Sequence, residues 1–400
     1  MDNGQCREAS ADYQSSIDHS PLDEVPAGYK RTEVGVIPED WGVYRLADHF
    51  VIYAGGDVPK DDYSDVQSEK HPYPIYANAI KEKGLYGYTS LKRGKPDSLT
   101  ITARGFLGHA EYRSKPFFPI VRLLVLEPCG HLDAKYTTYV INNRVQFAIE
   151  STGVPQLTAP QVGKYVVAAP STLEEQRAIA TALSDVDALI TALDKLIAKK
   201  RAIKTAAMQQ LLTGKTRLPG FSGEWETKRL GDIAHIQTGS KNNQDKVEGG
   251  QYPFFVRSET VERIDSYSYA CEAILVPGEG GIGSIFHYIN GRFDVHQRVY
   301  AITQFASNVS GKFVYLYMTN HFGAHAMRNT VKATVDSLRL PAFQSFEIRM
   351  PPTLDEQTAI AQVLSDMDAE IAALEARRDK TRAIKQGMMQ QVLTGRVRLV

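Results

Sequence analysis

The chain has 400 residues, with 46 basic and 46 acidic side chains and a formal net charge of zero. Its hydrophobic share of 43% and charged share of 23% are typical of a soluble globular protein, and its length predicts two or three domains. A neutral chain lacks the basic field of an autonomous nucleic-acid binder, and no apolar run reaches the roughly 18 residues that span a membrane.

The N-terminal segment begins MDNGQCREAS and has neither the apolar core nor the basic start of a signal peptide. We expect a polar, mostly disordered tail over residues 1–30. The three cysteines are Cys6, Cys129 and Cys271. Few and scattered cysteines favour a reducing compartment, so the cytoplasm is the expected location.

Residues 31–170 are predicted to form the first globular domain. Stretches rich in β-branched and apolar residues, bounded by Gly or Pro, predict strands within 98–105 and 119–128, and a short helix is expected at 135–144. A long helix follows in the segment 171–217. Thr172-x-x-Glu175 has the spacing of a capping box, and Gly214 is a natural helix stop.

The second half repeats this layout, with a globular domain at 218–351 and a second long helix at 352–400. Between Thr172 and Leu218, 28 of 47 positions are identical in the copy that begins 181 residues later, so we infer a duplication. Trp41 and Trp225 mark the start of each half. Strands are expected within 272–278 and 294–303, and a helix at 312–327. The globular stretches otherwise have little sequence in common.

Both long helices carry an apolar seam with the alternating four- and three-residue spacing of a coiled coil. In the first helix these positions are Ile179, Leu183, Val186, Ile190, Leu193 and Ile197. In the second they are Ile360, Leu364, Met367, Ile371 and Leu374. Ser and Asp favour caps over helix interiors, so a break at residues 184–185 or 365–366 is an open alternative.

Gly278-x-Gly280-x-x-Gly283 has the spacing of a dinucleotide-binding fingerprint, which requires a helix directly after it. The residues that follow instead alternate like strands of a hairpin. A tight glycine turn between strands, or a turn whose backbone approaches DNA, are the competing interpretations.

Other signs of chemistry are weak. Cys271, His287 and His296 could be argued to bind a metal but lack ligand spacing, and no phosphate-binding loop or nucleophile elbow occurs. The MPPT stretch at Met350 resembles an amino-methyltransferase motif without its flanking acidic and aromatic residues, and is better explained as the stop before a helix N-cap. We therefore expect no metal, no cofactor and no catalysis within this chain.

Basic and polar side chains interleaved with aromatic residues are a better signal. Such residues on loops contact base edges and phosphates. Any single one is more often a solvated loop residue, but two such sets on duplicated domains favour binding. The predicted DNA-binding residues are Arg104, His109, Tyr112, Arg113, Lys241, Asn242, Arg257, His287, Arg292, His296 and Arg298.

The layout of variable domain, repeated helix, second variable domain and repeated helix resembles the specificity subunit of type I restriction–modification systems. The segments GVIPEDWGVYRL, STLEEQRAIATAL and PTLDEQTAIAQVL carry the resemblance over residues 29–400, and the family's G-x-x-G turn corresponds to Gly105–Gly108 and Gly280–Gly283.

The resemblance implies a mixed α/β fold with two target recognition domains, each reading half of a split double-stranded DNA sequence, separated by a pair of antiparallel helices. It also implies a non-catalytic subunit on which two modification subunits, carrying S-adenosylmethionine, and restriction subunits with ATPase and nuclease activity assemble. A coiled-coil adaptor with two protein-binding domains, or the detached recognition part of a single-chain restriction enzyme, are the alternatives.

Overall fold

The computed structural model describes residues 25–148, 155–329 and 337–399. The chain divides into two compact units: unit 1 comprises residues 1–191 and 379–400, and unit 2 comprises residues 192–378. Each unit contains one globular stretch, the beginning of the helix that follows it, and the end of the other long helix. The tail predicted over residues 1–30 lies outside the described residues as far as residue 24, and Tyr29 begins the first strand.

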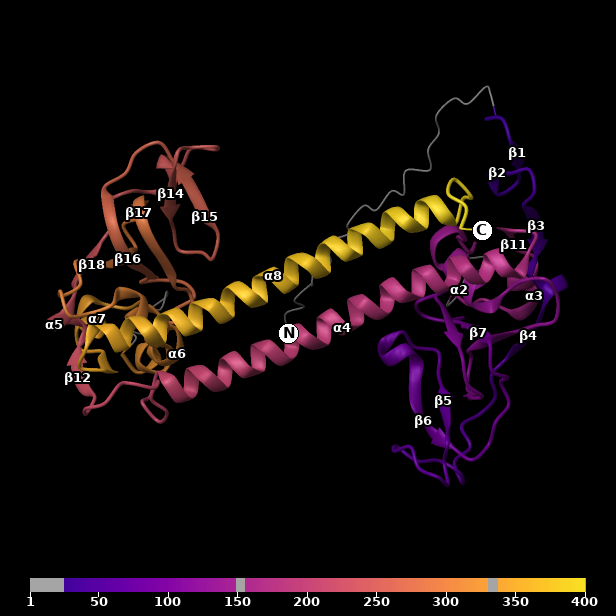
Figure 1. Cartoon of the computed structure of the whole chain (residues 1–400), viewed down its shortest axis with the longest axis horizontal. Coiled ribbons are helices and arrows are strands. Elements are labelled where there is room, and N and C mark those ends of the chain that lie inside the picture. Colours follow the sequence, from indigo (N-terminus) through magenta and orange to yellow (C-terminus); the bar gives the residue numbers. More distant parts are fainter. Residues whose placement is uncertain (1–24, 149–154, 330–336, 400) are drawn as a thin grey trace, which may run out of the picture. The chain divides into compact units, whose positions relative to one another are not determined.

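Unit 1 combines small β-sheets with helices (Figure 1). Its elements are β1 (Tyr29–Thr32), β2 (Gly35–Pro38), β3 (Gly42–Arg45), α1 (Leu46–His49), β4 (Phe50–Ala54), β5 (Tyr73–Tyr76), the 3-10 segment η1 (Lys81–Gly84), β6 (Leu85–Thr89), β7 (Ser98–Ile101), β8 (Ala110–Arg113), β9 (Phe118–Pro119), β10 (Leu124–Pro128), α2 (Ala134–Arg144), α3 (Ala159–Gly163), β11 (Val166–Ala169) and the beginning of α4 (Leu173–Leu211). The main sheet has the order β4-β10-β7-β8, a second sheet has the order β6-β5-β9, and β3 pairs with β11.

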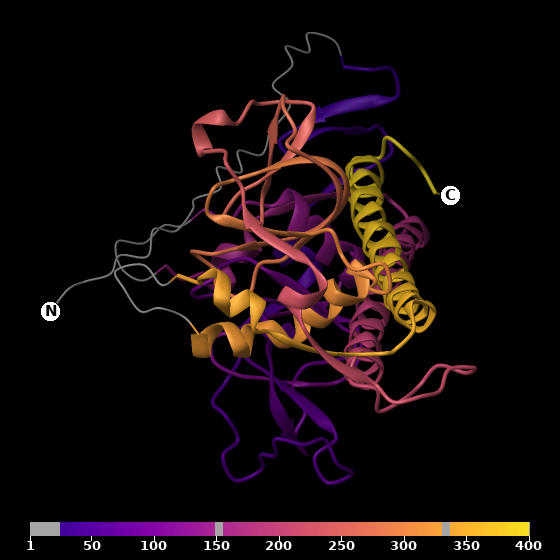
Figure 2. The ribbon, with the colours of Figure 1, turned by 90° about the vertical axis from the view of Figure 1, so that its left-hand side faces the viewer.

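Unit 2, whose strands are drawn in salmon and orange in Figure 2, contains one six-stranded sheet. The order of its strands is β13-β18-β16-β17-β14-β15. Its elements are β12 (Glu226–Arg229), α5 (Leu230–Ile233), β13 (His235–Thr238), the 3-10 segment η2 (Asn243–Asp245), β14 (Tyr252–Phe255), β15 (Val261–Ile264), β16 (Tyr269–Pro277), β17 (His287–Val295), β18 (Val299–Thr303), α6 (Gly311–Asn329), α7 (Leu340–Gln344), β19 (Glu347–Met350) and the beginning of α8 (Leu354–Val392). The strand pair β12–β19 corresponds to β3–β11 of unit 1.

The duplication extends into the globular parts, where sequence similarity is low. The order β4-β10-β7-β8 in unit 1 matches β13-β18-β16-β17 in unit 2, and a helix follows the strands in each (α2 and α6). The helices predicted at 135–144 and 312–327 are these two, and the predicted mixed α/β class is confirmed.

Alternate residues of β16 in unit 2 pack into two different hydrophobic clusters, one on each face of the sheet. Ile274 and Val276 pack with Phe313 and Val314 of α6, whereas Ala273 and Leu275 face a second cluster on the other side of the sheet. Side chains of a strand alternate between faces, so this nine-residue strand is apolar on both. The buried strand forms a rigid support for the turn that follows it.

Both long helices are continuous through residues 184–185 and 365–366, where the sequence left a helix break as an alternative. The hydroxyl of Ser184 donates to the carbonyl oxygen of Thr181 at 2.9 Å, and that of Ser365 to Ala361 at 2.7 Å. Because each hydroxyl is satisfied by a carbonyl of the preceding turn, the serines do not compete with the helix. The proposed break is therefore wrong, and α4 and α8 each extend over 39 residues.

The beginning of α8 lies antiparallel to the end of α4 within unit 2. Lys200 pairs with Glu370, and Lys204 pairs with Asp368. In unit 1, Lys385 and Asp187 form the repeat-related pair at 2.7 Å.

The predicted seam residues divide into two groups by burial. Ile179 and Leu183 are buried in the core of unit 1, and Ile360 and Leu364 in that of unit 2. Three other seam residues are also buried, namely Leu193, Ile197 and Ile371. The half-buried seam residues are Val186, Ile190, Met367 and Leu374.

The start of each long helix is tied to its globular part by a glutamine. The side chain of Gln176 donates to the carbonyls of Pro170 and His131 and accepts from the N–H of Asp133 at 2.8 Å. Its repeat partner Gln357 makes the same three kinds of bond in unit 2. The glutamine thus links the helix to the N-cap of α2 or α6.

The glutamate beside it is bound by an arginine from the end of the other long helix. Arg398 donates to both carboxylate oxygens of Glu175 in unit 1, and Arg217 does the same to Glu356 in unit 2. The backbone N–H of Glu175 donates to the hydroxyl oxygen of Thr172 at 3.3 Å, which is the expected N-cap bond. The carboxylate, however, binds arginine, so the predicted reciprocal capping box is only half formed.

Candidate nucleic-acid interface

The glycine-rich turn of unit 2 joins two antiparallel strands, β16 and β17. Gly280, Gly281 and Gly283 all have positive φ, and a Cβ on Gly283 would lie 2.9 Å from the Cα of Gly323 in α6. No helix follows the turn, so the fold excludes the dinucleotide interpretation. The expected hairpin is also wrong, because β17 and β18 pair with opposite edges of β16.

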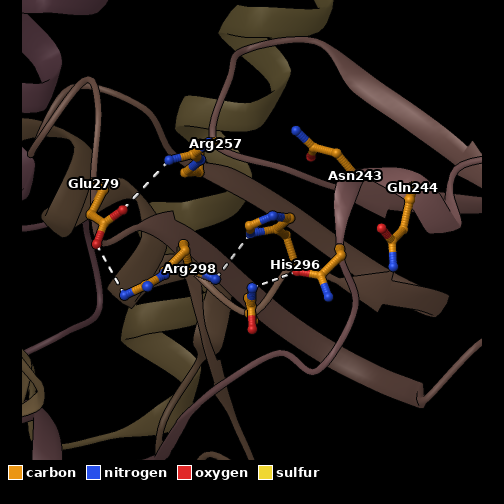
Figure 3. Close-up of a pocket in the computed structure, with 8 residues that line it drawn as sticks. Asn243, Gln244, Arg257, Glu279, His296 and Arg298 are labelled. Atoms are coloured by element: carbon orange, nitrogen blue, oxygen red, sulfur yellow. Dashed lines mark hydrogen bonds and ion pairs between the residues drawn. The ribbon is translucent and has the colours of Figure 1, made fainter.

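A pocket of about 530 Å³ opens beside this turn (Figure 3). Its walls come from the segment after β13, the end of β14, the glycine turn and the loop between β17 and β18. The residues that line it are Asn242, Asn243, Gln244, Arg257, Glu279, His296, Gln297 and Arg298. Four of the predicted DNA-binding residues are therefore brought together in one place, from positions up to 56 residues apart.

Backbone hydrogen bonds hold these walls together. The N–H of Lys241 donates to the carbonyl of Val295 at 3.3 Å, and the N–H of Gln297 donates back to Lys241 at 2.8 Å. The N–H of His296 donates to the carbonyl of Phe255 at 3.0 Å. Because three strand ends are linked in this way, the polar side chains stand on a rigid platform.

Two arginines of the pocket share one carboxylate. Glu279 lies between Arg257, at 3.5 Å from one oxygen, and Arg298, at 3.1 Å from the other. Figure 3 shows both guanidinium groups pointing toward the glutamate. A planar guanidinium carries five N–H donors, so most donors of both arginines remain free of this carboxylate.

The environment of the pocket histidine favours its neutral form. Burial, together with the nearby charges of Arg257 and Arg298, lowers the pKa of His296. Its Nδ1 accepts from the backbone N–H of Arg298 at 3.0 Å, so in the neutral ring the proton lies on Nε2. His296 is 5% exposed, and its environment favours the neutral ring with Nε2 as the hydrogen-bond donor.

The remaining predicted residues of unit 2 lie around the pocket or away from it. Nε2 of His287 bonds to the carbonyl of Ser258 at 3.1 Å, next to Arg257. Lys241 adjoins the lining, and among the described residues its ammonium has no ion-pair partner. Arg292 lies elsewhere, stacked 5.0 Å from the ring centroid of Tyr267.

The matching turn of unit 1 joins β7 to β8 and presents Arg104. The side chain of Asn78 fixes it: the amide oxygen accepts from the N–H of Ala103 and the amide nitrogen donates to the carbonyl of Arg104. Phe106 at the tip is 67% exposed, and His109 lies directly before β8, the strand that follows the turn. A rigid turn with an exposed arginine and aromatic ring suits a surface contact.

Two predicted contacts of unit 1 are already engaged inside the domain. Arg113 is 5% exposed, and its guanidinium donates to Thr100 and to the carbonyl of Lys83 while stacking on the Tyr76 ring. The hydroxyl of Tyr112 donates to Asp97. A buried, satisfied guanidinium cannot reach DNA from this position, so we correct the interpretation of Arg113 to a support for the β-sheet.

His109 forms part of a charged group beside the turn. Its Nε2 lies 3.1 Å from Glu111, which also faces Lys83 at 3.7 Å. Burial opposes the charge of this carboxyl, but the hydrogen bond from His109 and the charges of Lys83 and Arg113 hold the pKa of Glu111 below its usual range.

The functional residues that the sequence did not indicate are Asn78 and Glu279. Asn78 lies 25 residues before the backbone that it fixes, and Glu279 is separated from both arginines by intervening strands. Glu279 does occupy a position within the glycine motif, which is the one signal that could have found it.

Within the described ranges, no helix is long and apolar enough to cross a membrane, and His, Cys, Asp and Glu side chains form no group of three or more that could hold a metal.

Comparison with known proteins assigns the family. The family model for the type I restriction modification DNA specificity domain matches residues 38–204 and 222–382, which together make up most of the chain. The chain belongs to this family. The predicted resemblance is thereby confirmed, and the two matches fall on the two halves of the duplication.

Individual relatives agree with the assignment. The chain is 24% identical over 433 aligned positions to the putative type I restriction enzyme MjaX specificity subunit of Methanocaldococcus jannaschii, covering 93% of this chain and 97% of that protein. It is 29% identical over 171 residues to the type I restriction enzyme EcoDI specificity subunit of Escherichia coli, a match that covers 43% of this chain and 37% of that protein.

Among solved structures, the type I restriction–modification S subunit from M. genitalium has a similar fold. The TM-score is 0.67 at 15% sequence identity, over 88% of this chain and 96% of the other.

Proposed function

We propose that this chain is the DNA-specificity subunit of a type I restriction–modification complex, in which each globular part reads one half of a bipartite double-stranded DNA target. The observation that carries the proposal is the pair of equivalent glycine turns, β7–β8 and β16–β17. The first carries Arg104 and His109, and the second lies beside Arg257 and Arg298, which pair with its Glu279. The two turns present different side chains on the same strand order, as expected if the two half-sites differ.

The residues proposed to contact DNA differ in their exposure. In unit 1 they are Arg104 and His109, with Tyr112 at the margin and Arg113 as support. In unit 2 they are Lys241, Asn242, Arg257, His287 and Arg298, with Arg292 at a separate position on β17 and His296, which is 5% exposed, as support. Arg257 and Arg298 of the unit 2 pocket are exposed, so their guanidinium groups can contact phosphates or base edges.

The two repeat helices are proposed to set the spacer between half-sites and to dock two modification subunits. Repeated helices give one asymmetric chain two equivalent surfaces for two identical partners. Restriction subunits would join the same complex, in the cytoplasm. The chain itself is proposed to catalyse neither methyl transfer nor cleavage, since those reactions belong to its partners.

A segment exchange tests this function. Residues 219–350 are replaced by the same segment of another specificity subunit, and the methylated motif is mapped in cells that also make the modification subunit. We expect one half of the motif to change and the other half to stay. A change in both halves, or methyl transfer by the purified chain alone, would contradict the proposal.

The competing adaptor function predicts a different outcome. A coiled-coil adaptor would assemble with protein partners and produce no sequence-specific methylation, so the unmodified chain with its modification subunit provides the control. Absence of any methylated bipartite motif in that control would favour the adaptor.

A further inference from the structure

A carboxylate is unexpected in a surface that faces DNA, because it repels phosphates. Glu279 is the one acidic residue among those that line the pocket of unit 2 (Figure 3). Its two oxygens are divided between Arg257 and Arg298. The carboxylate therefore acts on the two arginines together, and its position needs a functional explanation.

Two neighbouring segments hold the backbone at Gly278 and Glu279. The N–H of Gly278 donates to the carbonyl of Arg298 at 2.9 Å, and its carbonyl accepts from the N–H of Leu338 at 2.8 Å. Glu279 itself forms an isolated bridge with Ser337. A side chain on so constrained a backbone can hold its partners in one orientation.

Exposure shows which groups are available to a ligand. The side chain of Glu279 is 21% exposed, compared with 46% for Arg257 and 55% for Arg298. The guanidinium groups thus present their free N–H donors to solvent, while the carboxylate is more shielded. Two guanidinium groups held in this way form a prepared donor surface.

We propose that Glu279 is a positioning residue that orients Arg257 and Arg298 to read guanine in the major groove of the half-site recognised by unit 2. This inference rests on the proposed function. An arginine that donates two hydrogen bonds to O6 and N7 of guanine makes the commonest specific protein–DNA contact, and it requires a fixed guanidinium plane. The glutamate also cancels one of the two positive charges, which limits binding to phosphates of any sequence.

The test uses the full chain assembled with its modification subunits and compares Glu279→Gln with Glu262→Gln. Glu262 is a matched control because it pairs with Lys246 at 3.4 Å beside the same face and contacts neither arginine. Competition binding with duplexes that differ at each position of the half-site gives the discrimination. We expect Glu279→Gln to lose about tenfold to a hundredfold discrimination at one or two G·C pairs of that half-site only.

Non-specific binding supplies a second readout. Freeing a guanidinium from its carboxylate should tighten binding to unrelated DNA and steepen the logarithmic salt dependence by about 0.9 for one added phosphate contact. Glu262→Gln should leave the discrimination at the guanine positions unchanged.

Modified bases identify the atoms that are read. With the unaltered chain, 7-deazaguanine at the affected position should weaken binding because it lacks N7, whereas inosine, which keeps N7 and O6, should not. Arg298→Lys, which keeps the charge but not the planar fork, should relax the same position and serves if Glu279→Gln does not fold.

The proposal is overturned if no guanine of this half-site is sensitive to 7-deaza substitution, or if Glu279→Gln and Arg298→Lys both keep full discrimination. A failure of the proposed function would look different, since the unaltered complex would then show no bipartite recognition at all.

Discussion

Replacing Arg398 by alanine should destabilise unit 1, because the change leaves a buried carboxylate without its counter-charge. Glu175 is 2% exposed and both its oxygens accept hydrogen bonds from Arg398, one of them at 2.7 Å. The same guanidinium bonds the exposed Asp40 at 2.7 and 2.9 Å. The arginine therefore joins the end of α8 to the start of α4 and to the loop before β3.

The magnitude follows from the burial of the two partners. Removing one partner of a fully buried ion pair costs about 3–5 kcal/mol. The side chain of Arg398 is 37% exposed, so solvent reduces this, and we expect a loss of about 2–3 kcal/mol. For a unit that spans residues 1–191 and 379–400, that corresponds to a thermal midpoint lowered by about 4–12 °C.

Tryptophan fluorescence can follow each unit separately, since the chain has two tryptophans and each unit contains one. Trp41 is buried against Gly395 in unit 1, and Trp225 lies against Gly214 in unit 2. In a Trp225→Phe background, the emission of Trp41 reports the thermal unfolding of unit 1 alone.

The repeat supplies the matched control. Arg217→Ala removes the equivalent partner of Glu356 and should lower the transition of unit 2, measured from Trp225 in a Trp41→Phe background. The reasoning is refuted if Arg398→Ala shifts the unit 1 midpoint by less than about 2 °C, or if either variant lowers both transitions equally.

The pH dependence of the stability of unit 1 provides an independent test of the Arg398 contacts. The hydrogen bonds from Arg398 lower the pKa of Asp40. This carboxylate therefore stabilises unit 1 fully above its ordinary pKa of about 4, and the contribution is lost as the pH falls from there through the lowered pKa. Arg398→Ala should remove this part of the acid dependence.

Two further changes test the turns. Asn78→Ala removes both side-chain bonds to the β7–β8 turn and should weaken recognition of the unit 1 half-site by about 1–2 kcal/mol, leaving the other half of the methylated motif unchanged. Gly283→Ala adds both a clash at 2.9 Å and the strain of positive φ, and should lower the stability of unit 2 by about 2–4 kcal/mol. Gly280→Ala, with its nearest neighbour at 4.0 Å, should cost about 1 kcal/mol in the same thermal assay.

Local patterns predicted much of the fold. The 181-residue repeat and the apolar seam located both long helices, because helix periodicity is written in neighbouring residues. The possible break at Ser184 was wrong, since its hydroxyl finds a carbonyl within the same helix. Strand pairing was harder, because the neighbours of β16 are fixed by contacts across the whole sheet.

The candidate site was predicted less completely for the same reason. Residue type identified arginines and histidines on loops, but burial separates Arg113 from the exposed Arg104 although both are basic residues near one glycine turn. Glu279 and Asn78 act only through partners brought near by the fold. Their roles depend on tertiary geometry, which no local pattern records.

The duplicated residues explain what the repeat preserves. Identical positions include the glutamate and glutamine at each helix start and the arginine beyond each helix end, and these make the same contacts in both units. Each arginine–glutamate contact joins the start of one copy to the end of the other, so each unit requires residues from both copies. Strand residues facing the candidate interface lie outside these joints. They can therefore differ between the units without disturbing the contacts that hold each helix to its domain.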